Sequence, residues 1–231
     1  MTLLLAVLVG LVLVGGAVGC GRGGASTSAA TSRPEPSTKY TVAGDSISLG
    51  LGAALRTKTG DDVVVKNIGA EGTGLARPDR FDWPGRLEEL ARDFPPTVLV
   101  FSLGSNDAQD LTDADGTVVA KASATQAWDA EYARRLGAAF DAFRGTPTKV
   151  LWVGPVRTAE DRVGLTNRRI QRLAADAAAS RPWVTVADLA ELLGTGEQPA
   201  ARCLRDDGLH LTTSCLDEAA TALVPRLTSL R

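Results

Sequence analysis

The chain contains a single histidine and only three cysteines among its 231 residues. No two cysteines form a C-x-x-C pair, so the sequence offers too few imidazole and thiolate ligands for a zinc site. Lys and Arg are scattered and number 25 against 27 Asp and Glu, so no broad positive field is available to a nucleic acid backbone. We therefore expect neither a metal nor a nucleic acid partner.

One long apolar run is present, at residues 3–19, and it predicts an export or anchoring segment within residues 1–20. Small residues precede Cys20, and Ala17-Val18-Gly19-Cys20 resembles a bacterial lipobox, in which Cys20 is lipidated. A cleaved secretory peptide and an uncleaved membrane anchor are the alternatives. All three place the remaining chain outside the cytoplasm, either secreted or held at the membrane.

Residues 21–38 are rich in Gly, Ala, Ser, Thr and Pro, which predicts a flexible tether. Residues 39–231 are enough for one domain with its own core. The overall composition, 44% hydrophobic and 23% charged, excludes a disordered, collagenous or multi-span membrane protein. We expect this domain to be a monomer.

The cysteines support an exported domain. If Cys20 carries lipid or leaves with the signal, Cys203 and Cys215 remain as a pair that an oxidising compartment can bridge. The bridge would close a loop of about a dozen residues around Asp207 and His210 and contribute on the order of 3 kcal/mol. Two free buried thiols are the alternative.

Short apolar runs alternate with helical patterns along the domain, and the run at residues 98–101 is apolar throughout, which indicates burial on both faces. This alternation predicts a three-layer α/β/α sandwich with a five-stranded parallel sheet, of the flavodoxin-like kind. The expected strands are residues 40–43, 63–65, 97–102, 150–153 and 183–186. The expected helices are residues 49–57, 83–93, 127–143, 165–179 and 216–230.

Polar and small residues follow the first three expected strands. Because ligands bind beyond the carboxyl ends of parallel strands, a site is expected there. The segments are Gly44-Asp45-Ser46, Asn67-Ile68-Gly69 and Gly104-Ser105-Asn106-Asp107. The longest segment expected to be irregular, residues 107–125, can border the cleft.

A serine nucleophile needs a general base within hydrogen-bond reach and a third group that orients the base. His210, the only histidine, follows Asp207 by three residues, so the carboxylate can reach one ring nitrogen. Ser46 would stand at a helix N-terminus, which favours developing negative charge. Alternatively, Ser46 is only a helix N-cap and His210 an ordinary surface residue.

Four short blocks, in order along nearly the whole domain, resemble the SGNH hydrolase superfamily, also called GDSL esterases and lipases. The blocks are Gly44-Asp45-Ser46-Ile47-Ser48-Leu49-Gly50, Asn67-Ile68-Gly69-Ala70-Glu71-Gly72-Thr73, Gly104-Ser105-Asn106-Asp107 and Asp207-Gly208-Leu209-His210. The resemblance implies a catalytic set of Ser46, Asp207 and His210. It also implies an oxyanion hole made by the Ser46 and Gly72 N–H groups and the Asn106 amide. Gly72 as a turn former and Asn106 as a turn cap are the alternatives.

A narrower likeness, carried by residues 72–79, 81–84 and 128–134, is to bacterial envelope SGNH-like proteins of unassigned function. In it, Arg77, Asp79 and Trp83 can line the acceptor side of the cleft. We favour the simpler interpretation that Trp83 and the following proline start a helix. Asp45 and Asp107 are expected to brace loops rather than transfer protons.

These residues predict a serine esterase that removes short, acetyl-like acyl groups from a small-molecule or glycan ester, through an acyl-enzyme on Ser46. The expected glycan belongs to the envelope or is extracellular, and no cofactor is implied. A cell-envelope O-acetyltransferase with the same site and a non-catalytic envelope binding module are the alternative functions.

Overall fold

The computed structural model describes residues 38–158, 161–195 and 201–231. The expected signal segment, its lipidation site Cys20 and the expected tether up to residue 37 lie outside the described residues. Among the helices that are described, none is long and apolar enough to cross a bilayer.

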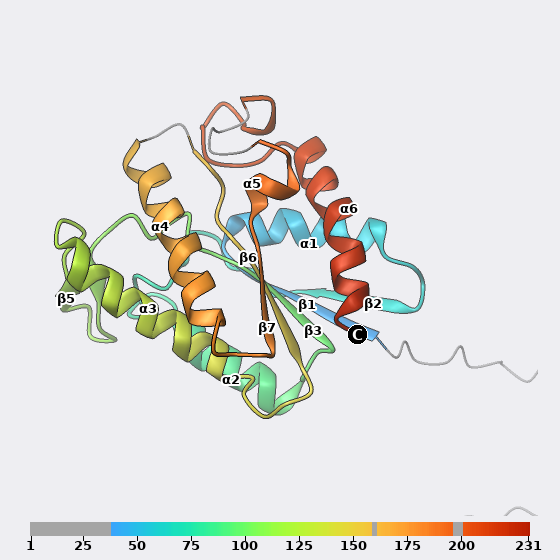
Figure 1. Cartoon of the computed structure of the whole chain (residues 1–231), viewed down its shortest axis with the longest axis horizontal. Helices are drawn as coiled ribbons and strands as arrows, with labels where there is room; N and C mark the ends of the chain where they lie inside the picture. The colour runs from blue at the N-terminus through green and yellow to red at the C-terminus, as the bar shows by residue number, and fades with distance from the viewer. Residues whose placement is uncertain (1–37, 159–160, 196–200) are drawn as a thin grey trace, which may run out of the picture. The chain divides into compact units, whose positions relative to one another are not determined.

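The domain is built on a parallel sheet of five strands in the order β2-β1-β3-β6-β7 (Figure 1). This is the flavodoxin-like order, so the predicted fold class is confirmed. The strands are β1 (Thr38–Gly44), β2 (Val63–Asn67), β3 (Val98–Ser102), β6 (Lys149–Val153) and β7 (Val184–Ala187).

Helices cover both faces of the sheet (Figure 1). One face carries α1 (Ser46–Lys58), α5 (Leu189–Leu192) and α6 (Thr213–Ser229), and the other carries α2 (Trp83–Asp93), α3 (Thr125–Asp141) and α4 (Asp161–Ala178). Along β3, Val98 and Val100 pack into the first core while Leu99 and Phe101 pack into the second. Each such side chain contributes about 1.5–3 kcal/mol when fully buried. The central strand is therefore firmly held by both layers.

The predicted fold missed several short elements. Within residues 107–125, expected to be irregular, β4 (Leu111–Thr112) and β5 (Val118–Ala120) form an antiparallel pair. The four-residue helix α5 and the 3₁₀ turn η1 (Ala201–Cys203) were not predicted either. Elements of two to four residues are too short to show a hydrophobic period, so the sequence pattern does not reveal them.

The crevice at the carboxyl edge lies between β1 and β3, where the strand order reverses. β1 ends at Gly44, whose φ is +130°, and a Cβ there would overlap the backbone carbonyl of Ser102 on β3. Only glycine allows the two strand ends to approach this closely. The chain then turns directly into α1, which places Ser46 at the edge of the sheet.

Candidate active site

Ser46 is the first residue of α1, and its hydroxyl is not used to cap the helix. The N-cap is Asp45, whose Oδ1 accepts the N–H of Ile47 at 3.0 Å. The half-buried Ser46 instead places its Oγ 2.8 Å from Nε2 of His210. The hydroxyl is thus available for chemistry at a helix N-terminus, where backbone N–H groups favour negative charge.

The loop around His210 supplies the orienting group. Asp207 Oδ2 lies 3.0 Å from His210 Nδ1, and Asp207 Oδ1 accepts the backbone N–H groups of His210 and Leu209, both at 2.8 Å. These two backbone hydrogen bonds are the main reason that the pKa of Asp207 is lowered to about 2. The ionised carboxylate holds the proton on Nδ1, which leaves the Nε2 lone pair facing Ser46.

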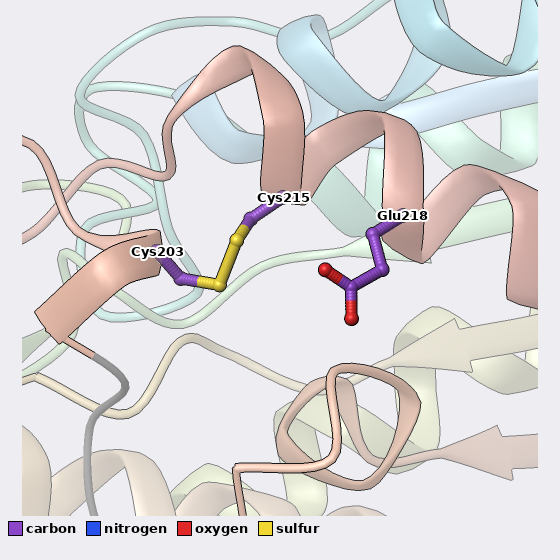
Figure 2. Close-up of side chains that lie close together, drawn as sticks. All are labelled: Cys203, Cys215 and Glu218. Carbon is purple, nitrogen blue, oxygen red and sulfur yellow. A yellow bond between two sulfur atoms is a disulfide. The ribbon is translucent and has the colours of Figure 1, made fainter.

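A disulfide between Cys203 and Cys215 closes the base of this loop, as predicted, so the alternative of two free thiols is wrong. Figure 2 shows the bond joining η1 to α6. Beside it, Thr212 N–H donates to the Cys203 carbonyl at 2.8 Å. The loop that carries His210 therefore has a covalent as well as a hydrogen-bonded anchor.

Glu218 lies close to both sulfur atoms (Figure 2), and the three side chains have the spacing of a metal ligand set. However, the sulfurs are bonded to each other and are not thiolates, and thiolates are the form that binds metal. The Glu218 carboxylate is paired with Arg202 at 2.8 and 3.0 Å. We interpret this cluster as a structural cross-link between η1 and α6. Our expectation that the domain needs no metal stays a prediction.

Reduction of the disulfide is expected to lower the free energy of unfolding by about 3 kcal/mol, because the unfolded chain regains the freedom of the closed loop. Thermal unfolding with and without dithiothreitol measures this change. A Cys203→Ser/Cys215→Ser double variant is the control. Its melting temperature should equal that of the reduced parent and should not change when dithiothreitol is added. Equal melting temperatures for the reduced and oxidised parent would contradict this expectation.

The two expected oxyanion donors beyond Ser46 line the same cavity as Ser46 and His210. Gly72 has a φ of +67°, a left-handed conformation that glycine adopts without strain. Asn106 Nδ2 donates one hydrogen to the Thr73 carbonyl at 2.9 Å. Because an amide nitrogen carries two hydrogens, the second is left for an oxyanion. Asn106 thus lies where the oxyanion donor was expected, and it also holds the loop of Thr73 in place.

The loop that follows Gly72 is held from both sides. The Asp107 carboxylate accepts the N–H groups of Leu75 and Ala76 at 3.0 and 2.9 Å. Arg135 Nη1 donates to the carbonyls of the same two residues at 2.7 and 3.1 Å. Tyr132 OH donates to Asp107 at 2.7 Å. These contacts fix the wall that carries the Gly72 N–H.

Tyr132 and Arg135 were not predicted as supporting residues. Both are buried on α3, where they follow Trp128 at helical spacing. A polar residue on the apolar face of a helix is a signal that sequence inspection can find, because a buried polar group needs a partner. The sequence alone does not say that the partner is the loop after Gly72.

The two aspartates expected to brace loops do so. Asp45 is 1% exposed and also accepts the Ser105 N–H at 3.2 Å, which ties the loop after β3 to the start of α1. Burial raises the pKa of Asp45 to about 7 and the pKa of Asp107 to about 6. Neither residue lines the cavity beside Ser46 and His210, so the two carboxylates support the loops around it without facing it.

The cavity measures about 670 Å³ and opens beside Ser46. Its walls combine apolar side chains with two exposed charged ones, Glu71 and Arg205. The lining residues are Ser46, Ile47, Leu49, Gly50, Glu71, Gly72, Asn106, Arg205, His210, Leu211 and Leu216.

The residues considered for an acceptor side do not line this cavity. Trp83 is completely buried and begins α2, as the favoured interpretation predicted, and its Nε1 donates to Thr73 Oγ1 at 3.0 Å. Arg77 and Asp79 form an ion pair at 2.6 Å. All three belong to the scaffold on the α2 side of the sheet.

The segment 107–125 was considered as a border of the cleft, and none of its residues lines the cavity beside Ser46. Its residues Asp113, Ala114 and Val119 line a separate cavity of about 460 Å³. The hairpin β4-β5 and the contacts of Asp107 turn the segment toward α3 instead.

A model of the family described as "Protein of unknown function (DUF459)" matches residues 39–223. No curated protein matches the sequence. Among solved structures, TesA shares 21% identity at a TM-score of 0.61, over 84% of this chain and 100% of that one.

An aryl esterase from M. smegmatis shares 18% identity at a TM-score of 0.57, over 84% of this chain and 100% of its own. The C-terminal catalytic domain of Streptococcus pneumoniae peptidoglycan O-acetyltransferase A (OatA), solved with a methylsulfonyl adduct, shares 13% identity at a TM-score of 0.56, over 84% of this chain and 94% of its own. At these identities the likeness establishes a common fold.

Proposed function

This chain belongs to the DUF459 family and has the SGNH hydrolase fold, and from that premise we propose that it is a serine esterase acting through an acyl-enzyme on Ser46. The observation that carries the proposal is the continuous hydrogen-bonded relay from Ser46 Oγ through the His210 ring to Asp207. The relay opens into a cavity that Gly72 and Asn106 also line.

In the acylation step, His210 Nε2 takes the proton of Ser46 Oγ as the oxygen attacks the ester carbonyl. The carbonyl oxygen becomes an oxyanion that the N–H groups of Ser46 and Gly72 and the Asn106 amide stabilise. Removing one such donor typically costs 10²–10³ in rate. His210 then gives its proton to the departing alcohol oxygen, and the acyl group stays on Ser46.

In the second step, His210 removes a proton from a water molecule, which attacks the acyl-enzyme carbonyl. The tetrahedral intermediate uses the same oxyanion donors. It collapses when His210 returns the proton to Ser46 Oγ, which releases the carboxylic acid and restores the starting site. Asp207 remains ionised throughout and stabilises the imidazolium of each step.

Short acyl groups on carbohydrate are the substrates that the cavity favours. Its apolar lining is limited to Ile47 and three leucines, while Glu71 and Arg205 make the remainder polar. Such a wall suits a small acyl group and a hydroxyl-rich alcohol better than a long lipid chain. The N-terminal segment would place this activity outside the cytoplasm, with Cys20 as the proposed lipid anchor, and the disulfide fits an oxidising compartment.

Acyl transfer to a sugar hydroxyl is the second candidate, and the fold shared with the OatA catalytic domain favours it. A hydroxyl that enters in place of water would be deprotonated by His210 in the same way. Partition of a labelled acetyl group between water and a glycan acceptor separates the two reactions. Label found in the glycan would favour transfer, and label found only as acetate would favour hydrolysis.

A fluorophosphonate probe tests the serine chemistry directly. The domain from Lys39 onward is expected to gain one adduct per chain, located on Ser46 by peptide mass, because only an activated serine reacts at an appreciable rate. Prior treatment with a small acetyl ester should slow the labelling. A folded, oxidised domain that gains no adduct would contradict the proposal and favour a non-catalytic binding module.

A further inference from the structure

Two charged side chains of opposite sign face the catalytic cavity without being paired. Arg205 and Glu71 are both exposed and both line the cavity beside Ser46 and His210. Within the described part of the chain, neither side chain makes a hydrogen bond or an ion pair. Their charges are therefore available to a ligand in the cavity.

The backbone at Arg205 is fixed relative to His210. The Arg205 N–H donates to the His210 carbonyl at 2.8 Å, and Gly208 N–H donates to the Arg205 carbonyl at 2.9 Å. Leu204 and Leu211 form the bridge next to this pair, and the disulfide closes the loop behind it. The guanidinium thus extends from a rigid base on the histidine side of the cavity.

The direction of proton transfer indicates which part of a bound ester lies on the His210 side of the cavity. His210 must deliver its proton to the alcohol oxygen as the acyl-enzyme forms, so the alcohol portion of the ester lies against the loop of His210. The carbonyl oxygen points instead to the wall of Gly72 and Asn106. Arg205 therefore faces the alcohol, whereas Glu71 adjoins Gly72 on the side of the proposed oxyanion donors.

We propose that Arg205 selects esters whose alcohol portion carries an anionic group, and this inference rests on the esterase activity proposed above. A guanidinium binds a carboxylate, phosphate or sulfate through charge-assisted hydrogen bonds with two parallel donors. The substrate class is then a short acyl group on an acidic carbohydrate.

A matched pair of aryl acetates tests this selection. The anionic 4-acetoxybenzoate and its neutral methyl ester carry the same acetyl group and differ in charge only on the alcohol side. After correction for their rates with hydroxide, the parent is expected to prefer the anion about tenfold in kcat/KM. Arg205→Gln should remove that preference by lowering kcat/KM for the anion about tenfold, while the neutral ester changes less than about twofold.

Glu71→Gln is the control variant, because it removes a charge from the same cavity and should leave the preference for the anionic alcohol in place. Salt supplies a second measurement: raising the ionic strength from about 0.05 to 0.5 M should weaken the preference of the parent and not affect Arg205→Gln. The melting temperatures of both variants should equal that of the parent, since both side chains are exposed.

An equal loss on both esters would show that Arg205 serves only the loop of His210, and an unchanged preference would show that it does not contact the alcohol. Either result overturns the inference while the esterase activity stands. A parent that hydrolyses neither ester and gains no fluorophosphonate adduct overturns the proposed function, and this inference with it.

Discussion

Ser46→Ala is expected to reduce ester hydrolysis by roughly 10⁴- to 10⁶-fold while leaving the melting temperature of the domain unchanged. The activity is lost because no acyl-enzyme can form without the Oγ nucleophile. The stability is kept because Asp45, not Ser46, caps α1, and alanine is the best helix former at the first helical position. Initial rates with an aryl acetate and a thermal melt measure the two quantities.

Ser48→Ala is the matched control two residues away. Ser48 is fully buried and donates its hydroxyl to the Asp45 carbonyl at 2.7 Å, so its loss should lower the melting temperature. The rate should stay within about tenfold of the parent, because Ser48 does not line the cavity. If Ser46→Ala retained the parent rate, the acyl-enzyme mechanism would be wrong.

Asp207→Asn is expected to lower kcat by roughly 10³- to 10⁴-fold, because the new amide enforces the wrong histidine tautomer. The N–H groups of Leu209 and His210 both point at one carboxylate oxygen of Asp207. An asparagine would therefore keep its carbonyl oxygen there and turn its NH₂ toward His210 Nδ1. That NH₂ donates, so the ring proton moves to Nε2, which can then no longer accept the proton of Ser46.

Asp207→Ala should also lower kcat by roughly 10⁴-fold, because the ring loses both its orienting group and the negative charge that stabilises the imidazolium. The pH dependence of kcat/KM gives a further check on the parent. Since the pKa of Asp207 is lowered to about 2, the carboxylate stays ionised above about pH 4, and its own titration should not shape the acid limb in that range. Near-parent activity of Asp207→Asn would indicate that a backbone carbonyl orients His210 instead.

Much of the fold could be predicted because its central strands are apolar on both faces. The run in β3 is fully buried, and a short, continuous apolar run of this kind is typical of a strand covered by helices on both sides. Helix starts were predicted less well: α1 begins at Ser46 rather than at residue 49. The early start depends on the hydrogen bond from Ile47 N–H to the Asp45 side chain, and sequence periodicity does not register such a bond.

The residues of the candidate site that could be predicted are those that directly follow a strand or lie in one of the four short sequence blocks. Ser46, Asp207 and His210 come together as expected, and Gly72 and Asn106 line their cavity. Arg205 was not predicted as a site residue, because a single arginine among other charged residues forms no recognisable motif. Its position depends on the pairing of Leu204 with Leu211, which is a tertiary contact.

The contact between Ser46 and His210 also constrains the order in which parts of the domain fold. Ser46 and His210 are 164 residues apart in sequence, and the serine is synthesised first. Bringing together two such distant points has a substantial loop-closure entropy, so this contact forms only when the intervening strands have already assembled. During synthesis, Ser46 would therefore lack its proposed base until the loop of Asp207 and His210 has folded into place. On the proposed function, the serine would become reactive only when the fold is complete.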